Sequence, residues 1–180
     1  FVFYKPKTWL SVLIRWFTNS YWQHTACIVL INNEVYVTEA NPKIIPIKWD
    51  KFVKNKIIKL SEANFEFNKS AMANILLSRT GDEYDYAGTL LHQAIYQLSG
   101  VWLGHTEGFA DRKLYCSEYI AWAYNKIQPD LFKNYYKTSP KDLANDNRFI
   151  DIYKGPAKDL MYYFNVEKNA WFFYNLKATN

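Results

Sequence analysis

The sequence predicts an α+β fold in which an antiparallel sheet packs against helices. Two observations carry this prediction: a β-hairpin pattern lies near the start of the chain, and several later segments show helical spacing of apolar residues. The elements follow one another as helix, hairpin, strand, helices and a late strand. This order is typical of α+β proteins, whereas a parallel sheet needs regular alternation of strands and helices.

An amphipathic helix is the first expected element, at residues 9–17. Ser11 and Arg15 mark its polar side. Its apolar side is formed by residues at helical intervals: Trp9, Leu10, Val12, Leu13, Trp16 and Phe17. We expect this side to pack on the core rather than on a membrane surface.

A β-hairpin follows at residues 25–31 and 34–40. The first segment is β-branched and apolar, and the second alternates in polarity. Asn32 and Asn33 between them suit a two-residue turn. Such a turn fixes the pairing of the two strands and therefore which side chains share a face.

The rest of the chain contains two expected strands and three expected helices. In chain order they are a strand at 56–60, a helix at 70–79 capped by Ser70, a helix at 86–98, a helix that starts near Cys116 and stops before Pro129, and a strand at 149–153. The chain shows no internal repeat, low-complexity tract or linker. Its 180 residues therefore suggest a single domain.

The composition limits the classes of partner. Apolar residues make up 49% of the chain, which suits a proper core, and no run of about 18 apolar residues predicts a membrane-spanning helix. The formal charge is +5, mostly from scattered lysines. The sequence contains no arginine cluster of the kind that would predict a nucleic-acid groove. We interpret the charge as a solvated basic surface, with attraction to an anionic cell wall or membrane surface as the alternative.

Cys116 is the first candidate for chemistry. A glycine-bearing loop precedes it and helical spacing follows it, so it lies near the first turn of a helix. Unpaired backbone N–H groups and the positive end of the helix dipole lie there. Both favour a thiolate, and the same N–H groups, at residues such as Ser117, can hold an oxyanion.

A thiolate nucleophile needs a base, and the base needs an orienting partner. Counting from the asparagine turn puts His24 and Glu39 on one face of the hairpin as diagonal neighbours, roughly 7–8 Å apart at the backbone. A glutamate side chain can cross that gap to a ring nitrogen. The hairpin therefore predicts a His24–Glu39 pair, and a pair at the sheet edge with no role is the alternative.

Three further residues compete for these roles. His92 lies in a helical pattern and suits a half-buried structural position. His105 is the reserve base because its loop directly precedes Cys116. Cys27 is an odd number of residues from His24 on the same strand, so its side chain points to the opposite face of the sheet. We expect it to be a small buried hydrophobic residue.

The polar segment at residues 81–86 is the remaining candidate. Its simpler role is a turn that starts the next helix, with Asp85 as the cap. Alternatively, the Tyr84 hydroxyl lies near the thiolate and donates to an oxyanion. The segment and the histidines show no metal-ligand spacing.

Several segments together resemble the circularly permuted papain-like hydrolases. Residues 20–29 and 36–40 resemble their "SHVGIV … VYEA" block, and residues 81–86 are similar to their "GxxYDY" segment. Residues 115–120 look like their "YCSELV" helix start, and residues 138–143 look like "TPxDL". The chain is thereby similar to the YiiX-like branch of the NlpC-type cysteine peptidase superfamily, a more distant relative of lecithin–retinol acyltransferase.

The resemblance implies a role for each candidate. Cys116 matches the nucleophile, His24 the base and Glu39 the orienting residue, and Tyr84 matches the family's tyrosine. Two departures are visible: the family's glycine after the histidine is replaced, and its "GD" near the domain start is missing.

The resemblance also divides the chain. It implies a permuted papain-like (NlpC-type) hydrolase domain at residues 1–150 and a C-terminal extension at 151–180 that packs on the same domain. The extension carries an aromatic tail that matches nothing in the family: Trp171, Phe172, Phe173 and Tyr174. We expect this tail to dock on an assembly partner or to cover the core.

The expected function is cleavage of an amide bond by a cysteine hydrolase through a thioester. A peptidoglycan peptide is the first-choice substrate, in a bacterial or phage setting outside the cytoplasm or in a virion. An acyl amide hydrolase or acyltransferase is one alternative, and a catalytically silent module of a larger assembly is another. No metal, organic cofactor, nucleic acid or membrane partner is expected.

Overall fold

The centre of the molecule is an antiparallel six-stranded sheet with the strand order β4-β3-β2-β1-β5-β8. It is seen in a computed structural model that describes residues 1–6, 9–104, 113–165 and 170–175. The strands are β1 (Val2–Tyr4), β2 (His24–Ile31), β3 (Glu34–Ala40), β4 (Ile44–Lys48), β5 (Ile57–Ala63) and β8 (Phe149–Pro156). The predicted α+β class with an antiparallel sheet is confirmed.

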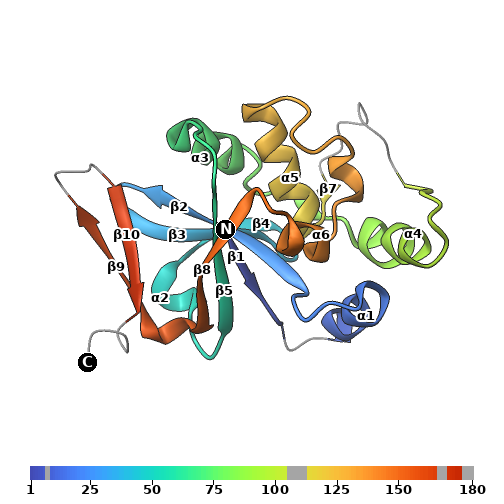
Figure 1. The fold of residues 1–180 in the computed structure, drawn as a ribbon, viewed down its shortest axis with the longest axis horizontal. Helices are drawn as coiled ribbons and strands as arrows, with labels where there is room; N and C mark the ends of the chain where they lie inside the picture. The colour runs from blue at the N-terminus through green and yellow to red at the C-terminus, as the bar shows by residue number, and fades with distance from the viewer. Residues whose placement is uncertain (7–8, 105–112, 166–169, 176–180) are drawn as a thin grey trace.

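Helices cover the sheet, and two small strand pairs complete the fold. The helical segments are α1 (Trp9–Thr18), α2 (Trp49–Phe52), α3 (Lys69–Leu77), η1 (Gly88–His92), α4 (Gln93–Ser99), α5 (Cys116–Ile127), η2 (Tyr135–Lys137), α6 (Pro140–Asn145) and η3 (Ala157–Asp159). The strand pairs are β6 (Glu83–Tyr84) with β7 (Lys113–Leu114), and β9 (Leu160–Asn165) with β10 (Ala170–Asn175). Figure 1 shows α3 and α5 above the sheet, α1 and α4 at one side and the β9–β10 hairpin at the opposite side.

Each face of the sheet has its own hydrophobic core. The larger core contains Phe3 and Cys27 together with Tyr119 of α5. The smaller core contains Ala26 and the Trp49 side chain of α2. Because side chains alternate along a strand, β2 supplies both cores, and the whole sheet is held from two sides.

The β2–β3 hairpin has the register that the sequence predicts. Ile28 pairs with Val37, and the strands are joined by a two-residue turn. Asn32 and Asn33 have φ values of 51° and 62°, as a turn of this type requires. The prediction that fixes the faces of the hairpin is therefore confirmed.

Several helix predictions need adjustment. Helix α3 is capped by Asn68 rather than by Ser70, because the Asn68 side-chain oxygen accepts a hydrogen bond from the Ala71 N–H at 2.9 Å. The helix predicted at residues 86–98 begins with the π-helical η1 and continues as α4. Asp85 caps it as predicted, since its carboxylate accepts from the Gly88 N–H at 2.8 Å.

The prediction for the apolar side of α1 is wrong in part. Trp9, Val12 and Trp16 are 68%, 65% and 70% exposed, whereas Ile14 is buried. The reason is the position of α1, which lies beside the sheet and packs against η1 and α4 (Figure 1). Only one stripe of the helix is covered there, so the tryptophan stripe faces outward.

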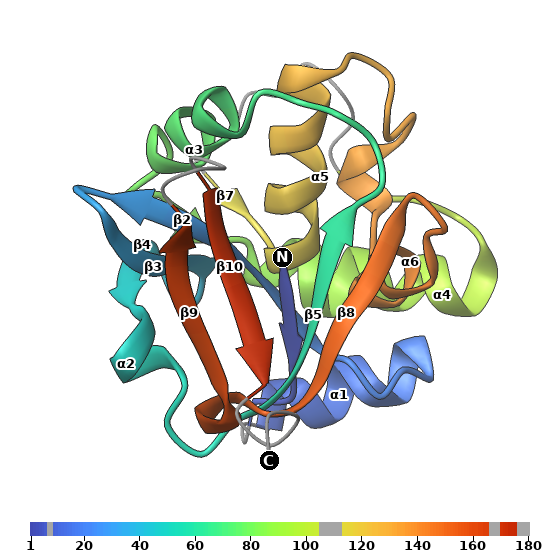
Figure 2. The ribbon, with the colours of Figure 1, turned by 60° about the vertical axis from the view of Figure 1, so that its left-hand side comes forward.

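Strand β8 runs across the expected domain boundary at residue 150. It pairs with β5 in the central sheet, and Figure 2 shows the two strands side by side. Residues 151–156 thus belong to the same sheet as the N-terminal strands. The aromatic tail at residues 171–174 lies in β10, and its side chains are outside the described part of the structure.

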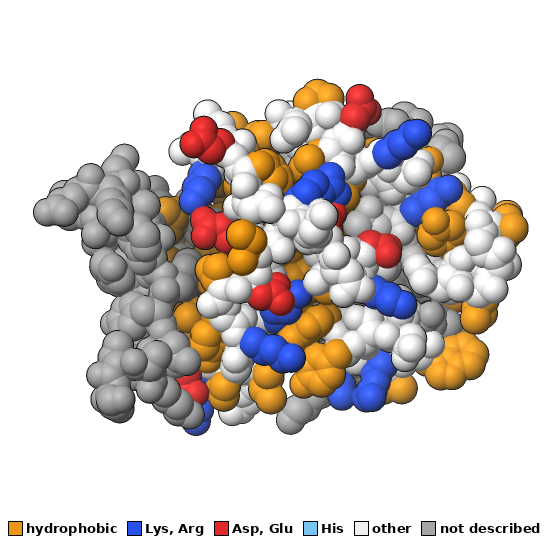
Figure 3. All heavy atoms as spheres, viewed as in Figure 1, with side chains coloured by type: hydrophobic (Ala, Val, Ile, Leu, Met, Phe, Trp, Pro, Cys, Tyr) orange, Lys and Arg blue, Asp and Glu red, His pale blue; other side chains and the backbone are white. Residues whose placement is uncertain are grey.

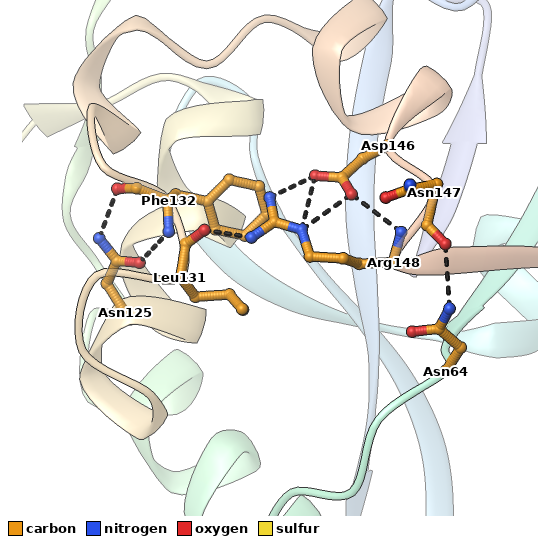
Figure 4. A network of polar contacts seen from close by, with 7 residues as sticks. All are labelled: Asn64, Asn125, Leu131, Phe132, Asp146, Asn147 and Arg148. Atoms are coloured by element: carbon orange, nitrogen blue, oxygen red, sulfur yellow. Dashed lines mark hydrogen bonds and ion pairs between the residues drawn. The ribbon is translucent and has the colours of Figure 1, made fainter.

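A polar network fixes the far end of α5 (Figure 4). Asn125 donates to the Phe132 carbonyl at 2.8 Å and accepts from the Phe132 N–H at 2.7 Å. Arg148 donates to the Asp146 carboxylate and to the Leu131 carbonyl, and its guanidinium lies 4.4 Å from the centre of the Phe132 ring. These contacts join the end of α5 to the start of β8 and so hold the helix axis in place.

The buried Tyr119 hydroxyl joins α5 to its neighbours and gives a stability test. It donates to the Leu76 carbonyl at 2.8 Å and lies 3.1 Å from the Thr38 hydroxyl. Tyr119→Phe removes this hydroxyl and leaves the Leu76 carbonyl and the Thr38 hydroxyl buried without their hydrogen-bond partner. We therefore expect the free energy of unfolding to fall by about 1–3 kcal/mol. Tyr36→Phe is the matched control because its hydroxyl bonds the exposed Glu34, and we expect a change within about 0.5 kcal/mol by urea denaturation. Equal losses for both variants would contradict this account of α5 packing.

Candidate active site

Cys116 is the first residue of α5, and α5 packs against β2. The backbone of Ser117 in the helix and of Thr25 in the strand lies close enough to its sulfur to lower the pKa of the thiol. The Glu118 carboxylate accepts from the Tyr115 N–H at 3.3 Å and so helps to cap the helix start. The predicted position of the cysteine at a helix N-terminus is confirmed.

His24 is the first residue of β2 and lies close enough to Cys116 for its charge to lower the pKa of the thiol. On its other side, His24 Nε2 lies 3.5 Å from Glu39 Oε2 on β3. The structure thus brings together the three residues that the hairpin count and the helix start single out. Because Nε2 faces Glu39, Nδ1 is the nitrogen that remains for the thiol proton.

Tyr4 is a further partner of Glu39. Its hydroxyl donates to Glu39 Oε2 at 2.5 Å, and β1 pairs Tyr4 directly with His24. The Nε2 atom faces the same oxygen at an ion-pair distance but outside hydrogen-bond geometry. Burial would raise the pKa of Glu39, but His24 and Tyr4 outweigh it and lower this pKa, so the carboxylate is charged. Sequence reasoning misses Tyr4 because a three-residue strand carries no readable alternation.

The electrostatics favour a charged pair. Burial alone would raise the pKa of Cys116, but the adjacent His24 and the backbone hydrogen bonds of Thr25 and Ser117 bring this pKa below its ordinary value. Burial alone would lower the pKa of His24, but Cys116 and Glu39 raise it to about 10. Both shifts favour a thiolate beside an imidazolium over a neutral thiol beside a neutral imidazole.

Tyr84 approaches the sulfur from β6. Its hydroxyl lies close to Cys116 and accepts a hydrogen bond from the Thr89 hydroxyl of η1 at 2.9 Å. Burial, and then the charge of Cys116, raises the pKa of Tyr84 well above its ordinary value. The phenol therefore keeps its proton and can act only as a donor to the sulfur or to an oxyanion. Thr89 carries no sequence signal, because a threonine in a helical pattern is ordinary.

Three buried polar side chains near these residues have atoms without a hydrogen-bond partner in the part of the chain that the structure describes. They are the Gln23 amide, the Thr25 hydroxyl and the Ser117 hydroxyl. Gln23 is fully buried and directly precedes His24. An unpaired buried polar group costs about 1–3 kcal/mol, so such groups often mark a place where water or a substrate binds.

Of the three competing residues, the structure describes Cys27 and His92. Cys27 is buried in the larger core, where burial raises its pKa to about 11, and the predicted small buried hydrophobe is confirmed. His92 is half-buried on η1, with its ring 6.0 Å from that of Trp102. His105 lies outside the described residues. Within the described ranges, no three His, Cys, Asp or Glu side chains are grouped so that they could hold a metal ion.

A comparison with solved structures finds a similar fold, although comparisons of the sequence find no match. No family model matches the sequence, and no curated protein matches it significantly. A solved structure, that of the metalloprotein YiiX from Escherichia coli O157:H7, superposes with a TM-score of 0.54 over 85% of this chain and 94% of that chain. The chain has a YiiX-like fold. The two sequences are 12% identical, so the likeness concerns the fold alone.

The lowered pKa of Cys116 can be tested by ultraviolet absorbance of the thiolate. In a Cys27→Ala background only Cys116 contributes. Because its pKa is below the ordinary value, we expect thiolate absorbance in the folded protein at about pH 7, which disappears in denaturant, where a free cysteine has a pKa of about 8.5. Adding His24→Ala should remove the signal from the folded protein as well. A folded protein that gains thiolate only above about pH 8.5 would contradict the charged pair.

Proposed function

We propose that this protein is a cysteine hydrolase that cleaves an amide bond through a thioester intermediate. The observation that carries the proposal is the convergence of four groups on one sulfur. These are the N–H at the start of α5, the backbone of Thr25, the His24 imidazole and the Tyr84 hydroxyl. At Cys27, by contrast, burial outweighs the charge of the N-terminal ammonium, so the pKa of that thiol is raised.

The first half of the reaction forms the thioester. The Cys116 thiolate attacks the amide carbonyl carbon, a C–S bond forms and negative charge moves to the carbonyl oxygen. The N–H at the helix start and the Tyr84 hydroxyl are placed to donate to that oxyanion. The His24 imidazolium then gives its proton to the leaving nitrogen as the C–N bond breaks.

The second half releases the acid. His24, now neutral, takes a proton from water as the water oxygen attacks the thioester carbon. The second tetrahedral intermediate collapses, the carboxylic acid leaves, and the thiolate and imidazolium are restored. Glu39, held by Tyr4, keeps the His24 ring oriented through both steps and stabilises its positive charge.

The substrate class and the finer fold assignment are part of the same proposal. The YiiX-like fold and the four sequence segments support a circularly permuted papain-like (NlpC-type) domain, with the chain order His24, Glu39, Cys116. A peptidoglycan peptide is the proposed substrate, and the exposed apolar side chains of α1 favour an acyl amide as the second candidate. A silent module with the same fold is the outcome if no amide is cleaved.

The proposed reaction requires that a substrate reach the Cys116 sulfur. Cys116 is 1% exposed, and His24 and Tyr84 are each 4% exposed. A carbonyl carbon must come within about 3–3.5 Å of the nucleophile, so substrate binding requires movement of the groups that cover it. Burial also keeps water away from the charged pair until that movement occurs.

The donor set does not fit a resident metal ion. YiiX is called a metalloprotein, but the described part of this chain has no cluster of three metal-ligating side chains. Cys116 and Glu39 lie on different sides of the His24 ring and therefore do not converge on one point. The proposed steps accordingly run through side-chain and backbone groups of this chain alone.

Single substitutions test the nucleophile and the base. We expect Cys116→Ala to abolish release of new amino groups from purified peptidoglycan, and His24→Ala to lower kcat by about 10²–10⁴-fold. Cys27→Ala is the matched control and should keep its rate, because burial among apolar side chains raises the pKa of the Cys27 thiol and so disfavours a thiolate there. Acyl amides are assayed in parallel. Full activity in Cys116→Ala, or no cleavage of any amide by the wild-type protein, would overturn the proposal.

The hydroxyl of Tyr84 gives an independent test of the oxyanion site. Tyr84→Phe keeps the ring but removes the donor, so kcat should fall by about 10²–10³-fold with little change in KM. Tyr86→Phe is the control, because its ring lies 4.9 Å from that of Tyr84 but is largely exposed. Equal effects of the two variants, or a change confined to KM, would remove Tyr84 from the chemistry.

A further inference from the structure

An exposed apolar surface lies on α1, η1, α4 and the segment that follows. We call it the α1–α4 surface, because α1 packs against η1 and α4. Its members are between half and three-quarters exposed: Trp9, Val12, Trp16, Leu91, Leu98, Val101 and Leu103. A large apolar surface of this kind usually marks a binding site rather than a solvated face.

The exposed apolar side chains of α1 form a single stripe along the helix. Trp9, Val12 and Trp16 follow the i, i+3, i+7 pattern of one helix stripe, and Ile14 and Thr18 are buried on the opposite side. The helix therefore has two apolar sides, one against η1 and α4 and one toward solvent. The second side, which carries the two tryptophans, stays mostly exposed to solvent.

The segments that carry this surface contain no acidic residue. No Asp or Glu occurs in residues 1–33 or in residues 86–106, which contain every member of the surface. Lys5 and Arg15 are exposed beside it. Figure 3 shows hydrophobic side chains over α1 and α4 with Lys and Arg side chains nearby. An apolar surface on segments whose charged residues are basic complements a negatively charged apolar interface.

We propose that the α1–α4 surface docks on a bilayer that contains anionic phospholipids. Tryptophan favours the boundary between headgroups and acyl chains, because its ring is apolar and its N–H is polar. An amphipathic helix with tryptophan and leucine on one side and basic residues beside them lies in the plane of that boundary. Lys5 and Arg15 then meet the phosphate groups while the tryptophans enter the acyl layer.

Other features agree with surface docking. Among the described residues, no helix is long and apolar enough to cross a membrane. The surface is also continuous with η1, whose Thr89 lies 2.9 Å from the Tyr84 hydroxyl beside Cys116. Docking would thus bring the candidate site close to the lipid interface. The docking itself does not depend on the thiol chemistry.

Vesicle sedimentation tests the proposal with the full chain. Vesicles of phosphatidylglycerol and phosphatidylcholine should bind the protein, and phosphatidylcholine alone should bind it more weakly. We expect the double variant Trp9→Ser/Trp16→Ser to lower the partition coefficient by about tenfold or more. Arg15→Gln should weaken binding to the anionic vesicles only, and added salt should have the same effect because it screens the charges.

Matched controls distinguish docking from nonspecific hydrophobic binding and from catalysis. Ile150→Ser/Ile152→Ser removes two side chains of β8 that are 55% and 50% exposed, and it should bind like the wild type. Cys116→Ala should also bind normally, which keeps the result apart from the proposed hydrolysis. Because Trp9 and Trp16 are mostly exposed, the double variant should keep its thermal unfolding temperature.

Three outcomes would overturn the proposal. The first is no binding of the wild type to anionic vesicles. The second is unchanged binding by a folded Trp9→Ser/Trp16→Ser variant. The third is binding to sedimented peptidoglycan, but not to vesicles, that the double variant loses, because this would make the surface a cell-wall site.

Discussion

The charged pair of Cys116 and His24 is the interaction around which the site is arranged. It forms where the first residue of α5 meets the first residue of β2. Neither residue would carry its charge alone, because burial opposes both charges. The pair exists only because the fold holds a helix N-terminus against the beginning of one particular strand.

Burying such a pair costs several kcal/mol per ion before compensation. The compensation comes from four directions: the backbone of the helix start, the backbone of Thr25, the Tyr84 hydroxyl and the Glu39 carboxylate. Tyr4 fixes that carboxylate in turn. The two cores on opposite faces of the sheet keep these groups in register, so packing and electrostatics depend on one another.

The sequence could predict the elements with a strong local pattern. The Asn32-Asn33 turn sets the hairpin register, and the register places His24 beside Glu39; the helix period places Cys116 at its start. Tyr4 and Thr89 could not be predicted, since the first lies in a three-residue strand and the second in a π-helical turn. The outward face of α1 could not be predicted either, because an amphipathic pattern does not say which neighbours will cover it.

The protonation state of His24 tests the charged pair most directly. Nitrogen chemical shifts of a protein labelled at its histidines report whether a ring is an imidazolium. An ordinary histidine, with a pKa of about 6.5, is neutral at about pH 8. Because its pKa is about 10, His24 should still carry both protons at that pH, and Cys116→Ala should make it neutral. A neutral His24 in the wild-type protein at about pH 8 would contradict the account.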